Sequence, residues 1–145
     1  MAGTGRTWGL LQGLVQGVRT SAMRAQLAER ARRAVGEVDG VRSVQLVLTR
    51  TGSFRTTLQG EIALEATERA EALCVYDAAM GAVVSLLHEA ELAPWGPEVG
   101  IGAIRGLLPT GDVLTGKDIA PRLPGRGVPL PEITASAFAS RYGLH

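Results

Sequence analysis

The chain has 145 residues, of which 46% are hydrophobic and 20% are charged, and its formal net charge is +1 at pH 7. This composition is typical of a globular protein and excludes a disordered chain, and the length fits one domain with terminal extensions. The single cysteine, Cys74, excludes an intrachain disulfide framework and a cysteine-based zinc site.

The charges are distributed unevenly along the chain. Residues 1–42 carry seven arginines and three acidic residues, whereas residues 43–98 carry three arginines and eight acidic residues. The two parts can therefore attract one another, within the fold or between copies. A nucleic-acid-binding domain is usually basic as a whole, with aromatic side chains between the cations, so the pattern argues against nucleic acid as the partner.

The first segment, residues 1–20, is rich in glycine. From Gly5 to Gly17 a glycine recurs every four residues, which on a helix makes a groove that another backbone can approach. Each interior glycine weakens a helix by about 1 kcal/mol relative to alanine. We therefore expect either a flexible arm or an arm that becomes helical against a partner or a lipid surface. The predicted contact residues are Trp8, Gly9, Leu10, Gly13, Leu14, Gly17 and Val18.

The same segment bears on localisation. The sequence contains no run of about 18 apolar residues, which argues against a membrane span. Gln12 and Gln16 interrupt the apolar stretch, and Arg19 and Arg24 stand where a signal peptide would be cleaved. We expect an uncleaved, cytoplasmic protein, with a peripheral position at a membrane as the alternative.

Residues 21–38 have the 3.6-residue apolar period of a helix, which Gly40 ends. Residues 44–49 and 54–64 then alternate apolar and polar side chains, which predicts a β-hairpin that turns at Gly52. One face of this hairpin is apolar, and the opposite face is short of charge. The opposite face carries Val47, Thr49, Thr57 and Gln59, and we expect such a face or its edges to be covered by another subunit.

A second, longer helix is predicted over residues 67–92, with Thr67 as its N-cap. Its apolar stripe is wide, so we expect coverage on more than one side, by the sheet and by another element or subunit. Residues 98–106 read as a third strand, in which Gly100 and Gly102 permit the close approach of a helix. The stripe comprises Leu73, Tyr76, Met80, Val83, Val84 and Leu87, and Cys74 is expected to pack beside it.

Residues 107–131 alternate prolines and glycines, which predicts a long loop or an extended arm. A short helix is expected after Pro131, ending at Gly143. Leu107, Leu114 and Leu123 are the apolar residues of the loop that we expect to contact a neighbouring subunit.

The stretch GDVLTGKD, Gly111–Asp118, resembles a phosphate-binding loop but departs from it in two ways. Asp118 stands where a hydroxyl would ligate Mg²⁺, and Pro121 and Pro124 exclude the long helix that should follow. The glycines are therefore interpreted as turn residues, and no nucleotide cofactor is predicted.

Metal and catalytic motifs are similarly weak. His88 and Glu91 would share one helical turn, but the only other histidine, His145, ends the chain, so we predict no metal site. Neither Cys74 nor Ser85 has a histidine spaced to activate it. The sequence therefore favours a non-catalytic protein with no cofactor.

The order helix, strand, strand, helix, strand over residues 21–105 resembles a BON-type domain. The segments GVRSVQLVL, TTLQGEIAL and ATERAEALCVYDAAMGAVV carry this resemblance. The resemblance implies a small αββαβ sandwich of the kind associated with bacterial envelopes, with phospholipid or protein partners. The chain is also similar to small actinobacterial proteins that end near RYG.

We therefore predict an α+β two-layer sandwich over residues 21–106. A roughly three-stranded antiparallel sheet would be covered by two helices on one face, between an N-terminal arm (1–20) and a C-terminal arm (107–145). The predicted function is that of an assembly protein that self-associates and contacts neighbouring subunits through its arms. The alternatives are a lipid-binding module and an enzyme with a 107–131 lid. The lipid-binding module would insert Trp8, Leu10, Leu11, Leu14 and Val18 and place Arg6, Arg19 and Arg24 on headgroups.

Overall fold

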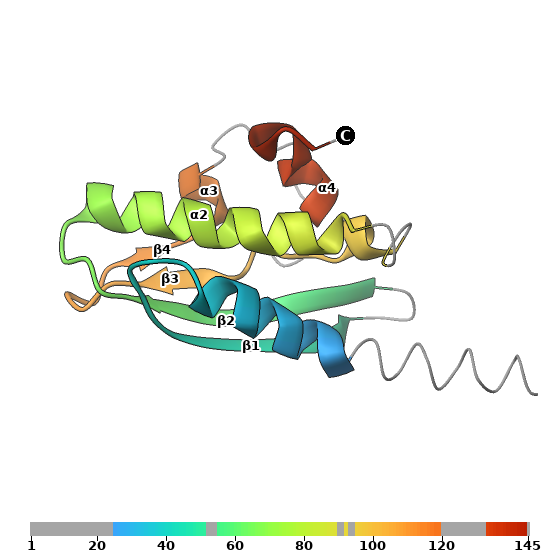
Figure 1. The fold of residues 1–145 in the computed structure, drawn as a ribbon, viewed down its shortest axis with the longest axis horizontal. Helices are drawn as coiled ribbons and strands as arrows, with labels where there is room; N and C mark the ends of the chain where they lie inside the picture. Colours follow the sequence, from blue (N-terminus) through green and yellow to red (C-terminus); the bar gives the residue numbers. More distant parts are fainter. Residues whose placement is uncertain (1–24, 52–54, 90–91, 93–94, 120–132, 145) are drawn as a thin grey trace, which may run out of the picture.

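A computed structural model describes residues 25–51, 55–89, 92, 95–119 and 133–144. They form an α+β fold in which helices lie against one face of a sheet (Figure 1). The strands are β1 (Val41–Thr51), β2 (Arg55–Leu64), β3 (Arg105–Leu107) and β4 (Val113–Leu114). The helical elements are a helix over residues 25–36, α2 (Arg69–Leu87), η2 (Gly96–Glu98), α3 (Gly116–Ile119), α4 (Ala135–Phe138) and η4 (Ala139–Tyr142).

The predicted hairpin is confirmed. β1 and β2 pair antiparallel, with Leu46 opposite Gly60 and Leu48 opposite Leu58. The period-2 alternation turns Leu46, Leu58 and Ile62 toward the helices, and all three are buried. The predicted turn at Gly52 lies outside the described residues.

The predicted sheet of roughly three antiparallel strands is close in strand number but wrong in the direction of one strand. The sheet has four strands in the order β1-β2-β3-β4, and β3 runs parallel to β2. The direction follows from the connection, because α2 carries the chain back across the sheet and a helical crossover joins parallel strands. The expected third strand begins late: Gly100 makes one parallel bridge to Thr57, and the regular pairing starts only at Arg105.

The predicted C-terminal arm is also wrong for the part of it that the structure describes. β4 and α3 form within the expected loop, and β4 pairs antiparallel with β3. The later segment also joins the fold, because the Ile101 N–H donates to the Ile133 carbonyl over 2.8 Å and the Ala135 N–H donates to the Val99 carbonyl over 2.9 Å. The buried residues in these segments are Leu108, Leu114, Ile119, Ile133, Ala135 and Phe138. Proline and glycine spacing could not reveal this, because the described turn at Pro109 and Gly111 joins β3 to β4 and returns the chain to the sheet.

The predicted helices end earlier than expected. The first runs over residues 25–36 in the described part of the chain, and α2 ends at Leu87, where His88 is the C-cap. Arg30 and Glu89 form an ion pair of 2.5 Å between the first helix and the end of α2. The two helices therefore lie next to one another.

The expectation that α2 is covered on more than one side is confirmed. α2 lies against the sheet, with the 25–36 helix on one flank and α3 and α4 on the other (Figure 1). Its buried residues are Ala72, Tyr76, Ala79, Met80, Val83, Val84, Leu86 and Leu87, whereas Cys74, which was expected to pack, is exposed. α2 is also the one described helix long and apolar enough to cross a membrane, a test that core helices pass as well.

Tyr76 joins α2 to the segment that leads into β3. Its buried hydroxyl donates to the Ile104 carbonyl over 2.6 Å, and burial raises the pKa of this phenol above its ordinary value. The ring lies so close to β3 that a Cβ at Gly106 would stand 2.8 Å from Tyr76 Cδ2. Close helix packing was predicted for Gly100 and Gly102, whereas the glycine that α2 requires is Gly106.

The C-terminal turn is fastened to α2 by an ionic cluster. Arg141 donates to both carboxylate oxygens of Asp77, over 2.8 and 2.7 Å, and the Tyr142 hydroxyl donates to Asp77 Oδ1 over 2.8 Å. The hydrogen bond from Arg141 lowers the pKa of Asp77, burial opposes this, and the Tyr142 hydrogen bond lowers it further. Burial, followed by the bond to Asp77, raises the pKa of Tyr142.

Replacement of Gly60 should destabilise the hairpin strongly. Gly60 has a φ of +148°, and a Cβ there would lie 1.8 Å from the Gln45 carbonyl oxygen. We expect Gly60→Ala to lower the free energy of unfolding by more than about 3 kcal/mol, measured by urea denaturation. Gly36→Ala is the matched control, because no atom lies within 4 Å of its Cβ position. This control should be neutral or stabilising by up to about 1 kcal/mol.

The Asp77 cluster should make stability depend on pH. Because the folded pKa of Asp77 is lowered, its contribution is complete above the unfolded value of about 3.9 and disappears as the pH falls through the folded pKa. Asp77→Asn should cost about 1 kcal/mol at pH 7, since the cluster is partly exposed, and less at about pH 3. Urea denaturation at both pH values tests this, with exposed Asp112→Asn as the control. An equal cost at the two pH values would contradict the prediction.

Candidate functional site

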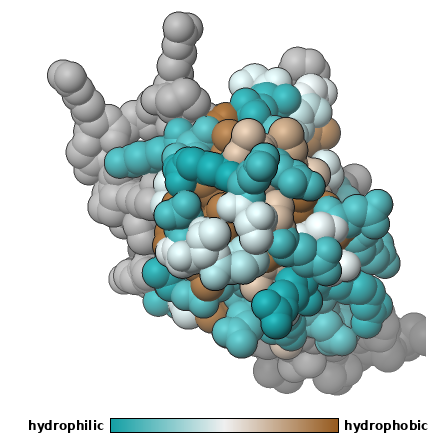
Figure 2. Space-filling model, turned by 90° about the vertical axis from the view of Figure 1, so that its left-hand side faces the viewer, coloured by the Kyte–Doolittle hydropathy of each residue, from teal (hydrophilic) through white to brown (hydrophobic). Residues whose placement is uncertain are grey.

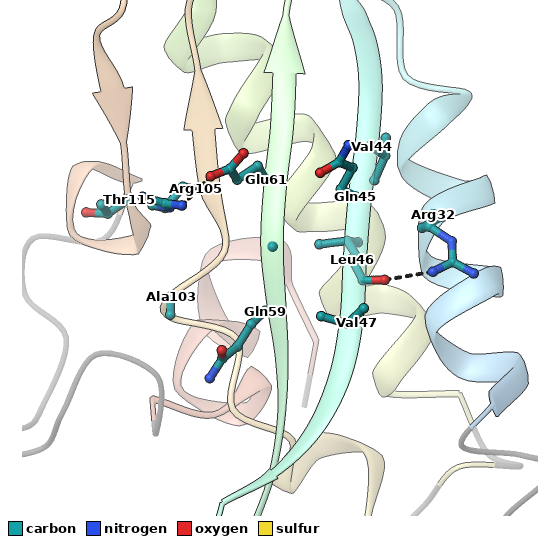
Figure 3. A pocket seen from close by; sticks show the side chains of 11 residues that line it. Arg32, Val44, Gln45, Leu46, Val47, Gln59, Glu61, Ala103, Arg105 and Thr115 are labelled. Atoms are coloured by element: carbon teal, nitrogen blue, oxygen red, sulfur yellow. Dashed lines mark hydrogen bonds and ion pairs between the residues drawn. The ribbon is translucent and has the colours of Figure 1, made fainter.

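The sheet face opposite α2, which we name the open face, has no described helix on it (Figures 1 and 3). The strand registers place odd-numbered residues of β1 and β2 on this face, because Leu46 and Gly60 are paired and face the helices. The same alternation continues through β3 to β4. The open face comprises Gln45, Val47, Thr49, Thr57, Gln59, Glu61, Ala63, Arg105, Leu107 and Val113.

A shallow concavity of about 860 Å³ lies over the middle of the open face (Figure 3). Gln45, Gln59 and Ala103 line its floor, and Thr115 lies at the side of β4. Arg32, from the 25–36 helix, closes the opposite side next to β1. The concavity therefore brings together side chains that lie far apart in the sequence.

Two arginines and one carboxylate give this concavity its charge. Arg105 and Glu61 stand opposite one another on β3 and β2 and form an ion pair. Arg32 Nη1 donates instead to the Leu46 carbonyl on β1, over 2.8 Å (Figure 3). Within the described residues, Arg32 has no carboxylate partner, so the lining carries one net positive charge.

A threonine cluster extends the open face beyond the concavity. The hydroxyls of Thr49 and Thr57 lie 2.9 Å apart, and Gln59 Nε2 donates to Thr57 Oγ1 over 3.2 Å. Thr57 is buried, and these bonds satisfy its hydroxyl. The cluster is a structural pairing across the hairpin rather than an activated hydroxyl, because no histidine lies among the residues of this face.

A second concavity, of about 350 Å³, lies along β1. It shares Arg32 and Val47 with the first, so the two meet at these side chains. The other lining residues are Ala25, Ala28, Leu48, Thr49, Arg50 and Thr56. The hollow surface therefore continues from the open face along the side of β1 that faces the 25–36 helix.

The residues that line the two concavities include no histidine, no cysteine and no pair of carboxylates, the groups that acid–base and nucleophilic catalysis commonly use. In the described part of the chain, no group of three or more His, Cys, Asp or Glu side chains is arranged to hold a metal ion. His88 Nδ1 lies 2.9 Å from the Val84 carbonyl of its own helix. This site offers hydrogen bonds, charge and apolar contact.

Within the Gly111–Asp118 segment, the backbone binds the carboxylate of Asp118. The Thr115 N–H donates to Asp118 Oδ2 over 2.7 Å, and Arg69 Nη2 donates to Asp118 Oδ1 over 2.9 Å. Asp118 therefore occupies the start of the short helix α3, where a phosphate-binding loop would hold its anion. Gly111, with a φ of +97°, is a turn residue as interpreted, whereas Gly116 begins α3 and packs against Phe138, so its interpretation as a turn residue is wrong.

Of the predicted interaction residues, the structure describes Leu107 and Leu114, and they differ in exposure. Leu114 is fully buried and unavailable to a partner, whereas Leu107 is half-buried on the open face. Trp8, Gly9, Leu10, Gly13, Leu14, Gly17, Val18 and Leu123 lie outside the described residues, and their role stays a prediction. Val47, Thr49, Thr57 and Gln59 lie on the face opposite the helices, as predicted.

Sequence reasoning missed Val113, Arg105 and Arg32 as members of one surface. Val47 and Val113 are 56% and 41% exposed, and they are the exposed large hydrophobic side chains in the described part of the chain. Both lie on the open face. Only β4 places Val113 there, and no sequence pattern predicts so short a strand.

The end of the molecule at the β2–α2 connection has a different character. Figure 2 shows this end as predominantly hydrophilic. Its exposed residues include Glu65, Glu68, Arg69, Glu71 and Asp112. The open face is therefore the better candidate for a contact surface.

Comparison of the sequence with protein-family models and with curated proteins finds no match. The resemblance to BON-type domains therefore stays a prediction.

The Glu61–Arg105 pair should contribute little to stability, because both side chains are partly exposed to solvent. A double-mutant cycle with Glu61→Gln and Arg105→Gln should give a coupling free energy below about 1 kcal/mol that falls as salt is added. Urea denaturation of the four proteins measures it. A coupling well above this range would mean that the pair is fixed and not available to a partner.

Proposed function

We propose that the protein is a non-catalytic assembly module that self-associates through its open face. The observation that carries the proposal is that the two exposed large hydrophobic side chains, Val47 and Val113, lie on the same face of the sheet among the described residues. Half-buried Ala63 and Leu107 lie between β1 and Val113. Single exposed apolar side chains are ordinary, but here both lie on one sheet face with half-buried apolar side chains between them, which favours that face as an interaction site.

The chemistry of the face supports a second copy as the partner. Across a two-fold axis the same surface meets itself, so Glu61 of each copy can pair with Arg105 of the other. Sheets pack face to face at about 10 Å, a distance that side chains of this size can fill. The mixture of valine, glutamine, threonine and one ion pair fits a non-obligate interface, whose apolar fraction is close to that of ordinary surface.

A charged side chain introduced in place of either exposed valine should weaken this association. We expect the wild-type protein to form a dimer at high concentration, and Val113→Glu or Val47→Glu to weaken dimerisation by at least about tenfold, because each adds a charge to a desolvated contact. Sedimentation equilibrium measures the change. Both positions are exposed, so the free energy of unfolding should change by less than about 0.5 kcal/mol.

Ala70→Glu is the matched control, since Ala70 is exposed in the first turn of α2, away from the open face. It should leave the dimerisation constant unchanged. A wild-type protein that stays monomeric at its highest soluble concentration would refute the proposal, as would a dimer that tolerates both valine substitutions.

A further inference from the structure

The outer edge of β1 is a second surface, distinct from the open face. β1 has 11 residues and ends the sheet on the side of the 25–36 helix. The Leu46 carbonyl accepts from Arg32, so it points away from β2. In an antiparallel strand the N–H and C=O of one residue point the same way, and this direction alternates along the chain. Val44, Leu46 and Leu48 therefore present their backbone groups outward.

These outward groups are open to a partner. Within the described residues, Arg32 supplies the hydrogen bond to the Leu46 carbonyl, and no other bond to the outer row at Val44, Leu46 or Leu48 is formed. The opposite edge of the sheet is β4, which has only two residues. A long, unpaired edge strand is a template for another strand unless the protein covers it, and here one arginine side chain lies over it.

The second concavity gives this edge the space that a strand needs. It runs along β1 from Val47 to Arg50 and meets the concavity of the open face at Arg32 and Val47. Ala25 and Ala28 of the first helix line the far side, and their small side chains leave room next to the strand. A groove between a strand edge and a helix is the arrangement in which proteins bind extended peptides by strand addition.

The positive charge of the groove favours an acidic partner. Arg32 and Arg50 line it, and within the described residues neither has a carboxylate partner. None of the described residues that line this groove is acidic, and Glu61 in the adjoining concavity of the open face is already paired with Arg105. A second copy of β1 would bring Arg50 and its own Arg32 to the same groove, whereas an acidic strand would neutralise both arginines.

We propose that the β1 edge binds an extended, acidic segment of a protein partner, which adds to the sheet as a fifth strand beside β1. An N–H of the incoming strand takes the place of Arg32 at the Leu46 carbonyl. The released guanidinium then pairs with a carboxylate of the segment, a stronger, charge-assisted bond than the one it leaves. The inference goes beyond self-association, because it uses the sheet edge and a different partner.

A synthetic peptide tests this directly. The probe is a fluorescent peptide of alternating valine and glutamate, of about eight residues, a usual strand length. Fluorescence anisotropy with the full chain should show binding, and exchanging glutamate for lysine should weaken it by at least about tenfold. A version N-methylated on alternate residues keeps its charge but lacks the N–H donors, and it should also lose at least about tenfold.

Protein variants locate the site. Arg32→Gln keeps a donor for the Leu46 carbonyl but removes the charge, and should lower the affinity for the acidic peptide by about tenfold. Arg33→Gln is the matched control on the same helix, since Arg33 lines neither concavity, and it should leave the affinity unchanged. Amide hydrogen exchange should show new protection at Val44, Leu46 and Leu48 when the peptide binds.

Three results would overturn the inference. Equal binding of the acidic and lysine peptides would exclude charge recognition, and undiminished binding of the N-methylated peptide would exclude strand addition. Protection of Leu46 and Leu48 in a peptide-free dimer, with no competition by the peptide, would assign the edge to a second copy instead.

Discussion

The burial of α2 is the constraint on which the rest of this fold depends. Most of its apolar side chains are buried, among them Tyr76, Met80 and Val83, which are fully inaccessible to solvent. No single sheet can cover so wide a surface. The sheet packs on one side, the 25–36 helix and the C-terminal elements fill the two flanks, and the chain between β2 and β3 must therefore cross over. The parallel pairing of β3 with β2 follows from this crossover.

The same constraint decides which surface is left for a partner. The other helical elements pack against α2 and therefore lie on its side of the sheet. The opposite face carries side chains and no described helix (Figure 3). Gly106 lets Tyr76 of α2 pack closely on β3, and Gly60 lets β2 approach the Gln45 carbonyl of β1. Val47 and Val113 then remain exposed at the two ends of the open face. Self-association and strand addition are both ways of covering what this one-sided arrangement leaves exposed.

Arg32 links these two surfaces. It lines both concavities, and its bond to the Leu46 carbonyl covers part of an edge that would otherwise pair with other strands. A long side chain from a neighbouring helix can be displaced at little cost, whereas a covering strand cannot. The edge is therefore protected against indiscriminate pairing while it stays accessible to a segment that gives the guanidinium a better partner.

The sequence by itself determined the elements whose pattern is local. The alternation over 44–64 predicted the hairpin and the membership of its two faces, including Val47 and Gln59, and the helical period predicted α2 and its multiple coverage. Only the tertiary structure decided the parallel β3, the short β4 and the packing of 133–144, because these are held by partners distant in the chain. Ile133 pairs beside Ile101, and Val113 reaches the open face only through pairing with Leu107. Local patterns record which side of an element is apolar, but not which distant element will cover it.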